Sequence, residues 1–329
     1  MRTACLTLTL AIGVWVPAGP VLGAQPPAAK AGKPSLRKEL AALKVPPAWF
    51  QTTPVGYDTS KPWKEARLEI RRLLGLGDLQ SLRQAMKMTY VYHRKNDIGD
   101  GHEFPMYLFL GGEVAWATQV YEAFVRELLA ARKDGYTHDY SGLISCYRHF
   151  GEYAKAVETA NLALQHLPEP PYDVLNQAHV FDALGDIHAE MGDPAGAKAY
   201  YRQAIQLYPT AKPKFGRHLL PRRAAKVRGK LDMLDMKAIR PGQLRDGTYT
   251  GKSLGYVEDV HVTVVVRGSR IAEVNLRHKE NIPLGSTEMI PRRIVEMQSL
   301  NVQAVTGATT TCDAIRHGAL EALRKAGLK

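Results

Sequence analysis

The stretch Val260–Leu276 reads VHVTVVVRGSRIAEVNL and gives the clearest structural signal in the chain. Valine fills every second position from Val260 to Val266, and polar residues stand between the first of them. Alternation with a period of two predicts a strand with one buried face. The pair Gly268-Ser269 then supplies a two-residue turn before a second strand. The sequence therefore predicts a β-hairpin.

A further strand and two helices extend this unit. Gly247–Gly251 has strand-forming residues and is expected to pair with the hairpin. Residues 291–300 and 313–325 have helical spacing. We expect an antiparallel sheet covered by these two helices, which makes residues 246–329 a small α+β domain.

Between the two predicted helices, Asn301–Cys312 reads NVQAVTGATTTC, a cluster of hydroxyls around a Gly-Ala pair. Small residues let the backbone approach a bulky group, and the start of the next helix would direct unpaired N–H groups at a phosphate. We expect Thr311 at the N-cap. The alternative reading is that Thr309, Thr310 and Thr311 only cap the helix.

The segment Thr306–Thr311 resembles the S/T-G-A-T-x-S/T signature of the periplasmic FMN-binding domain, found in flavin subunits of ion-pumping NADH:quinone reductases and related complexes. The likeness extends through Arg277–Ile282 and Pro291–Leu300. It implies FMN joined by a phosphoester to the hydroxyl of Thr311, attached by a separate flavin transferase that uses FAD and Mg²⁺. The residues that would bind the cofactor are Thr306, Gly307, Ala308, Thr309, Thr310, Thr311 and His278.

One position departs from that family. Its members usually carry Asp three residues before the first hydroxyl of the signature, where this chain has Gln303. If the carboxylate helps the transferase, flavin attachment would be slow or absent here, although Gln can donate and accept hydrogen bonds. This departure favours an alternative, an extracytoplasmic interaction scaffold whose flavin domain holds no cofactor.

Four side chains are candidates for shaping the environment of a flavin ring. His278 and Lys279 follow a predicted strand and could stabilise a reduced, anionic flavin. Tyr249 and Tyr256 could stack on the ring, with packing in the sheet or exposure at the surface as the competing interpretation.

Residues 63–237 have helical periodicity, and two units within them resemble tetratricopeptide repeats. Leu74–Tyr92 and Tyr107–Ala131 are expected to add degenerate or capping hairpins. Such arrays bind a peptide or protein along a concave surface, or serve as spacers. The clearer unit has Leu184, Gly185, His188, Gly192, Ala197, Tyr201, Ala204 and Pro209, and the earlier one has Leu143, Tyr147, Gly151, Ala156, Ala163 and Pro168.

The N-terminal residues 1–24 have one early charge, Arg2, followed by apolar and small residues that end in Leu22-Gly23-Ala24. This pattern predicts a secretory signal peptide and a periplasmic or otherwise extracytoplasmic protein. An uncleaved leader that anchors the chain is the alternative. Residues 25–62, rich in Pro, Ala and Lys, are predicted to be a linker with an extended lead-in, and residues 238–245 a second linker.

The chain has 329 residues and a net charge of +12, with a basic run from Lys214 to Lys230. That run could meet an acidic redox partner or anionic lipid, as a peripheral membrane contact, but clustered charge usually marks a solvated helix face. We expect no nucleic-acid partner, because the run lacks interleaved aromatic residues. Cys146 is expected in the core and Cys312 to be partly exposed.

A metal site is not expected. The acidic and histidine residues near the start of the helical region lack the spacing of an EF-hand or of a helical metal site, and predict a loop with a helix cap. They are His93, Asp97, Asp100, His102 and Glu103.

Together these patterns predict an α+β chain, an all-α helical-repeat domain followed by a small α+β FMN-binding domain with an antiparallel sheet. We expect an exported electron carrier with covalent FMN, matured by a flavin transferase and served by a protein redox partner, rather than a stand-alone enzyme. A flavin subunit of an extracytoplasmic reductase is a further alternative.

Overall fold

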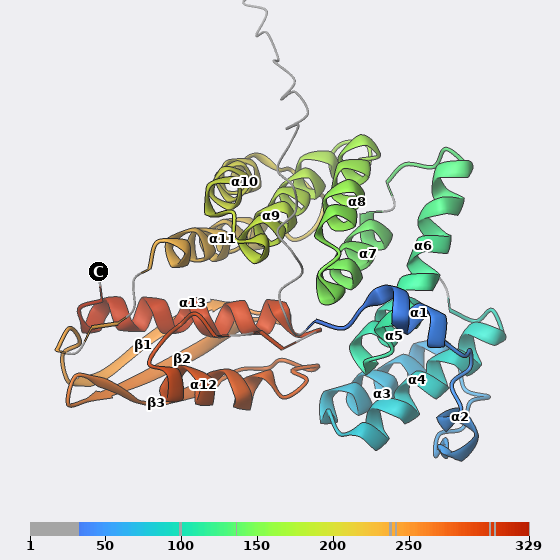
Figure 1. The fold of residues 1–329 in the computed structure, drawn as a ribbon, viewed down its shortest axis with the longest axis horizontal. Coiled ribbons are helices and arrows are strands. Elements are labelled where there is room, and N and C mark those ends of the chain that lie inside the picture. Colours follow the sequence, from blue (N-terminus) through green and yellow to red (C-terminus); the bar gives the residue numbers. More distant parts are fainter. Residues whose placement is uncertain are drawn as a thin grey trace, which may run out of the picture.

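The computed structural model describes residues 33–98, 101–135, 137–236, 239–240, 242–302, 304–305 and 307–328. A long helical part leads into a small unit of sheet and helices (Figure 1). The predicted α+β class, with a repeat-like helical domain before an antiparallel sheet, is confirmed. The predicted signal peptide, residues 1–24, lies outside the described residues.

In the helical part, neighbouring helices pack as hairpins: α3 with α4, α5 with α6, α7 with α8 and α9 with α10. Short 3-10 turns at Tyr208–Thr210 and Arg217–Leu219 precede the last helix. The helices are α1 (Leu36–Ala42), α2 (Trp49–Thr52), α3 (Trp63–Leu76), α4 (Leu79–Arg94), α5 (Glu103–Gly111), α6 (Val114–Ala130), α7 (Thr137–Phe150), α8 (Tyr153–Gln165), α9 (Asp173–Met191), α10 (Pro194–Leu207) and α11 (Leu220–Leu234).

Small residues set how closely these helices approach. A Cβ atom on Gly185 of α9 would lie 2.3 Å from a ring carbon of Tyr201 on α10. A Cβ atom on Gly142 of α7 would lie 2.1 Å from the ring of Tyr121 on α6. Each glycine thus makes room for a tyrosine of the neighbouring helix, which is the packing expected of the small and large positions in the repeat pattern.

The described part of the predicted linker contains helices instead of a simple extended lead-in. Prolines keep α1 and α2 short, because each Pro ends or prevents a helical turn. Leu36 and Phe50 are nevertheless buried in the helical core. Trp49 Nε1 donates a hydrogen bond to Glu113 at 2.9 Å. The aromatic residues of this stretch pack on the next domain.

The C-terminal sheet has three antiparallel strands in the order β1 (Gly247–Leu254), β2 (Asp259–Arg267), β3 (Arg270–Arg277). The predicted hairpin is confirmed. Gly268 and Ser269 both have positive φ, 56° and 58°, as a type I′ turn requires. The Asp246 carboxylate accepts hydrogen bonds from both turn N–H groups at 2.8 Å, which fixes the turn.

Helices α12 (Ser286–Met297) and α13 (Thr309–Ala326) cover the buried face of the sheet. Contact between α13 and the sheet is close because both sides use glycine. A Cβ atom on Gly251 of β1 would lie 2.1 Å from the carbonyl oxygen of Gly318. The alternating valines of β2 are buried, as their pattern predicts.

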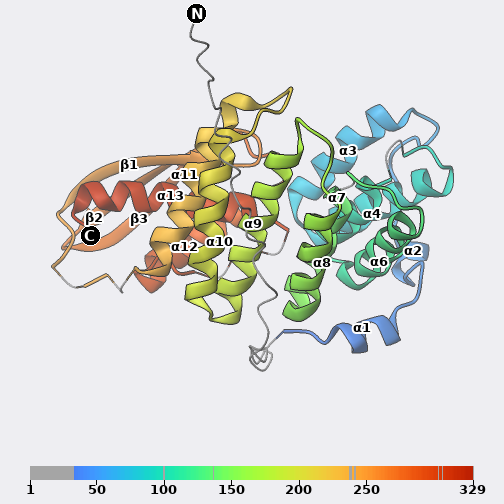
Figure 2. The same cartoon turned by 90° about the horizontal axis from the view of Figure 1, so that it is seen from above.

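The helical part and the C-terminal unit pack directly against each other. Helix α11 lies beside α13 (Figures 1 and 2), and a Cβ atom on Gly229 would lie 2.1 Å from the ring of His317. Leu244, placed in the predicted second linker, is buried in the C-terminal core. The two parts therefore share a packed interface, and at least one residue of the predicted linker belongs to the C-terminal core.

Candidate functional site

The hydroxyl cluster lies where the loop after α12 enters α13. Gly307 has a φ of 81°, and Ala308 is the N-cap, with no side-chain hydrogen bond. Thr311 is therefore the third residue of α13, so its predicted N-cap position is wrong. Capping does not explain the threonines, because the N-cap is Ala308, three residues before the expected Thr311. Thr306 and Gln303 lie outside the described residues.

The three threonines of the first turn of α13 differ in exposure. Thr309 is exposed, Thr310 is half-buried, and Thr311 is only 3% exposed. The Thr311 hydroxyl donates a hydrogen bond to Glu280 Oε2. A buried hydroxyl bonded to a buried carboxylate is a specific arrangement, because each polar group removed from water needs a partner.

Glu280 links three segments of the C-terminal unit. Its carboxylate accepts hydrogen bonds from the backbone N–H groups of Tyr256 and Val257, both at 3.0 Å, in the loop between β1 and β2. Its own N–H donates to His278 Nδ1 at 3.2 Å. Glu280 itself lies just after β3. The sequence reasoning missed its role, although it stands within the segment Arg277–Ile282 that carries the family likeness.

The predicted ring contacts divide into two groups. Tyr256 is 62% exposed beside Glu280, so its ring is free to meet a ligand. Tyr249 instead packs on the C-terminal core, and its hydroxyl donates to the Arg245 carbonyl at 3.1 Å. Lys279 pairs with Glu258 at 3.3 Å. His278 is half-buried and supports Glu280 through the backbone.

Helices far away in sequence form one wall of the site. A Cβ atom on Gly307 would lie 2.8 Å from Leu284 Cδ1 and 3.2 Å from Leu110 Cδ2, which belongs to α5. Ile282 packs into the apolar cluster of α3, α4 and α5. A Cβ atom on Gly75 of α3 would lie 2.6 Å from the Asn281 carbonyl oxygen. The loop of the hydroxyl cluster is therefore seated against the helical domain.

This wall carries a fixed positive charge. Arg71 Nε donates to Tyr107 Oη at 2.8 Å, and Arg71 Nη2 donates to Glu103 Oε1 at 3.1 Å. Burial lowers the pKa of Arg71, but its bond to Tyr107 and the charges of Tyr107, Glu103 and Tyr256 raise it above its ordinary value. The Glu103 carboxylate pairs with this guanidinium and partly compensates its charge.

Cys312 differs from its prediction. It is fully buried, and its Sγ accepts a hydrogen bond from the Val305 N–H at 3.3 Å. Burial raises the pKa of the thiol to about 11. The expected partial exposure is therefore wrong, because α13 turns this residue into the C-terminal core. Cys146 is buried in the helical core, as predicted.

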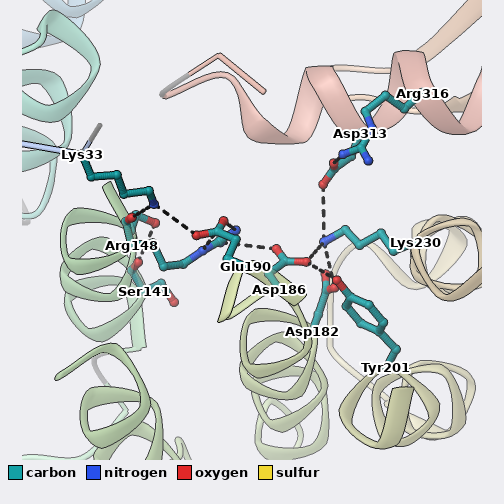
Figure 3. Close-up of polar contacts among 11 residues, drawn as sticks. Lys33, Ser141, Arg148, Asp182, Asp186, Glu190, Tyr201, Lys230, Asp313 and Arg316 are labelled. Atoms are coloured by element: carbon teal, nitrogen blue, oxygen red, sulfur yellow. Dashed lines mark hydrogen bonds and ion pairs between the residues drawn. The ribbon is translucent and has the colours of Figure 1, made fainter. Parts of the chain in front are cut away.

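A buried charge network anchors α13 to the helical domain (Figure 3). Lys230 Nζ of α11 lies 2.9 Å from Asp182 and 2.8 Å from Asp186, both on α9, and 3.4 Å from Asp313 on α13. Arg148 of α7 extends the network to Asp186 at 3.3 Å. Burial lowers the pKa of Lys230, but the carboxylates raise it well above its ordinary value.

The prediction that the basic run from Lys214 to Lys230 forms a solvated helix face is thus only partly correct. Lys214, Arg217 and Arg228 are exposed. Lys230 instead enters the buried network, and Arg222 pairs with Asp259 at the start of β2. These two residues join the domains because α11 packs on α10 of the helical part and on α13 and β1 of the C-terminal unit, a relation that no local pattern contains.

Within the described ranges, no group of His, Cys, Asp and Glu could hold a metal ion. His93 stacks on Phe104 with ring centroids 3.9 Å apart, and His102 is the N-cap of α5. Asp100 lies outside the described residues. In the same part of the chain, no helix combines the length and apolarity needed to cross a bilayer.

One segment in each part of the chain matches a known family. Residues 255–324 match the FMN-binding domain, and residues 178–211 match the tetratricopeptide repeat. The first match includes Glu280 and Thr311, and the second covers α10 and most of α9. The chain therefore carries an FMN-binding domain after a tetratricopeptide repeat, and both resemblances seen in the sequence are confirmed.

A stretch of 90 residues is 29% identical to part of an NADH:acrylate oxidoreductase of Vibrio harveyi. It covers 26% of this chain and 9% of that relative, so the chain spans a small part of the relative's length. No solved structure matches the chain. The FMN-binding domain and this relative indicate a flavin-associated role in electron transfer.

Proposed function

We propose that this chain is an exported electron-transfer flavoprotein that carries FMN as a phosphoester on Thr311 and docks through its helical repeats. The observation that supports this most strongly is the Thr311 hydroxyl, buried in the first turn of α13 and bonded to Glu280, inside the region that matches the FMN-binding domain. The pattern of residues 1–24 supports export.

The residues around Thr311 fit a phosphate-linked flavin. Two adjacent backbone N–H groups, of Tyr256 and Val257, already hold anionic oxygens beside the hydroxyl. The first turn of α13 adds the positive end of a helix dipole. When bound, FMN supplies one- and two-electron redox chemistry. Tyr256 offers an exposed ring for stacking.

A covalent link suits a carrier outside the cytosol. Cofactor bound only by noncovalent contacts would be lost by dilution, whereas an ester retains it whatever its affinity. The chain's own residues then need only orient the ring and set the charge around it. For partners, we propose a flavin transferase, a redox protein held by the repeats, and peripheral membrane contact through the exposed basic residues of Lys214–Arg228.

The first test is intact-mass spectrometry of the full chain after co-expression with a flavin transferase. We expect the mass of the wild-type protein to increase by one esterified FMN. Thr311→Ala should abolish the addition because no acceptor oxygen remains. Thr248→Ala is the matched control, since it removes an exposed hydroxyl of β1 that lies outside the signature Thr306–Thr311 and should leave the addition intact.

Two outcomes would contradict the proposal: an unmodified wild-type chain, or full modification of Thr311→Ala. The first would favour the second candidate, a cofactor-free interaction scaffold, to which Gln303 points. In that case Gln303→Asp is the informative variant. Flavin attachment to Gln303→Asp alone would show that loss of the family's carboxylate disabled the site.

The activity of the Vibrio harveyi relative suggests another form of the leading proposal, in which this chain is the flavin subunit of an extracytoplasmic reductase. Reduction of a small acceptor by the purified, flavin-loaded chain would support the reductase. Electron exchange with a partner protein and no turnover alone would support the carrier.

A further inference from the structure

The hydrogen bond between Thr311 and Glu280 places a carboxylate, which can act as a base, next to the hydroxyl oxygen that would carry the flavin. Thr311 Oγ1 donates a hydrogen bond to Glu280 Oε2. Both residues are buried, with Thr311 3% and Glu280 8% exposed. The remaining contacts of Glu280 hold its carboxylate in place: the N–H groups of Tyr256 and Val257 on its oxygens, and His278 on its backbone. The pair is preorganised.

We propose that Glu280 is the general base for attachment of the flavin to Thr311. This inference rests on the proposed function. In the step, Thr311 Oγ1 attacks the phosphorus on the FMN side of FAD, presented with Mg²⁺ by the transferase. The new O–P bond forms as the P–O bond to AMP breaks, and AMP leaves with that electron pair. The Oγ1 proton passes to Glu280. Nothing is oxidised or reduced.

The geometry suits this role for two reasons. An alcohol is a weak nucleophile until an adjacent base takes its proton, and the O–H bond of Thr311 already points at Glu280. The lone pairs of Oγ1 therefore face away from Glu280, and they can reach phosphorus once the transferase exposes this buried side chain. Once protonated, Glu280 is neutral, so the incoming phosphate meets a hydrogen-bond donor and no second buried negative charge.

Glu280 also has a structural task, which the test must separate from the chemical one. Its carboxylate pins Tyr256 and Val257, so its loss could disorder the loop between β1 and β2. Glu280→Gln keeps the size of the side chain and one acceptor oxygen, but it cannot take a proton. Because Tyr256 and Val257 bond to different carboxylate oxygens, the variant keeps the acceptor of only one of these two N–H groups. The matched control is Glu258→Gln, in the same loop, whose carboxylate pairs with Lys279 instead.

The experiment follows the mass of the full chain over time with excess transferase, FAD and Mg²⁺, together with hydrogen exchange at the amides of Tyr256 and Val257. We expect Glu280→Gln to acquire FMN at least about 100-fold more slowly than wild type, the usual effect of losing a general base. Amide protection should stay near the wild-type level for the N–H group that faces the retained oxygen. Glu258→Gln should react at the wild-type rate.

Attachment to Glu280→Gln at the wild-type rate would overturn the inference and leave the FMN ester on Thr311 standing. Slow attachment accompanied by lost protection at both amides would also overturn it, because the role would then be structural. A wild-type chain that takes no FMN contradicts the proposed function itself. If Glu280→Gln does not fold, Glu280→Ala with added formate replaces it: formate should accelerate attachment, and no acceleration would count against the base.

Discussion

Gly307 shows how a single residue is fixed by two independent constraints. Its φ of 81° belongs to the left-handed region, which side chains with a Cβ atom adopt at a cost. Its Cβ position is also occupied, because Leu284 and Leu110 lie 2.8 Å and 3.2 Å away. The glycine of the hydroxyl cluster therefore serves the packing of the site as well as access to a ligand.

Gly307→Ala should consequently destabilise the chain more than an alanine at another glycine with the same φ. Gly192, at the end of α9, has a φ of 81° and nothing within 4 Å of its Cβ position. We expect Gly192→Ala to cost about 1 kcal/mol from backbone strain, and Gly307→Ala about 1–2 kcal/mol more from displacement of Leu284. Urea unfolding of both variants measures the difference, and equal costs would refute the crowding.

The residue-level expectations for the site came from local signals. The composition of the hydroxyl cluster marked Thr311, but its place three residues into α13, and its burial, depend on where the helix begins. Glu280 was visible in the segment that carries the family likeness, yet nothing in that segment says that its side chain reaches a threonine 31 residues further on. Such a contact requires the folded loop between β1 and β2.

Among the elements, the hairpin of β2 and β3 was the most predictable. The Asp246 carboxylate binds the backbone of its turn, a contact that we call the clamp. The N–H groups of Ser269 and Gly268 bond to the Asp246 carboxylate and lower its pKa below the ordinary 3.8. A lowered pKa means that the ionised side chain stabilises the folded state above the unfolded pKa. This contribution is lost as the pH falls through the folded pKa.

Asp246→Ala should therefore lower the melting temperature of the C-terminal unit at neutral pH and change it little in acid. Circular dichroism melts of wild type and variant, from pH 7 down to about pH 2, give the comparison. The wild type in acid is the internal control, because protonated Asp246 has lost the charge that the turn amides stabilise. A difference in melting temperature that is constant over this range would contradict the clamp.

Elements outside the hairpin were predicted less well. Helix α12 begins at Ser286, ahead of the predicted start, and the linker region forms α1 and α2. In both places prolines suggested breaks, but the apolar residues around them found partners elsewhere in the fold. Burial of Phe50 in the helical core is one case. Tertiary contacts outweigh such weak local preferences.

For the molecule as a whole, Lys230 matters most to how the two domains are held together. It ties α9 and α11 to the helix that carries Thr311 (Figure 3). Its side chain is 9% exposed, so its charge and those of Asp182 and Asp186 are mutually dependent. Removing one partner from a buried ion pair leaves an uncompensated charge. The two domains should therefore unfold together.

Lys230→Met should lower the free energy of unfolding by about 3–5 kcal/mol, the usual result of breaking a buried ion pair. Lys198→Met, which breaks a pair with the exposed Asp235, should cost no more than about 1 kcal/mol. Guanidinium unfolding, monitored separately by fluorescence and by circular dichroism, gives both values. A small cost at Lys230, equal to that at Lys198, would show that the network does not hold the domains together.

The sequence by itself determined the hairpin, the repeat pattern and the hydroxyl cluster, because period, turn chemistry and short signatures act within a few residues. Only the tertiary structure decided that Glu280 meets Thr311, that α3 and α5 form a wall of the candidate site, and that Lys230 is buried between three carboxylates. These contacts join segments far apart in the chain, and their geometry arises only when whole elements pack against one another.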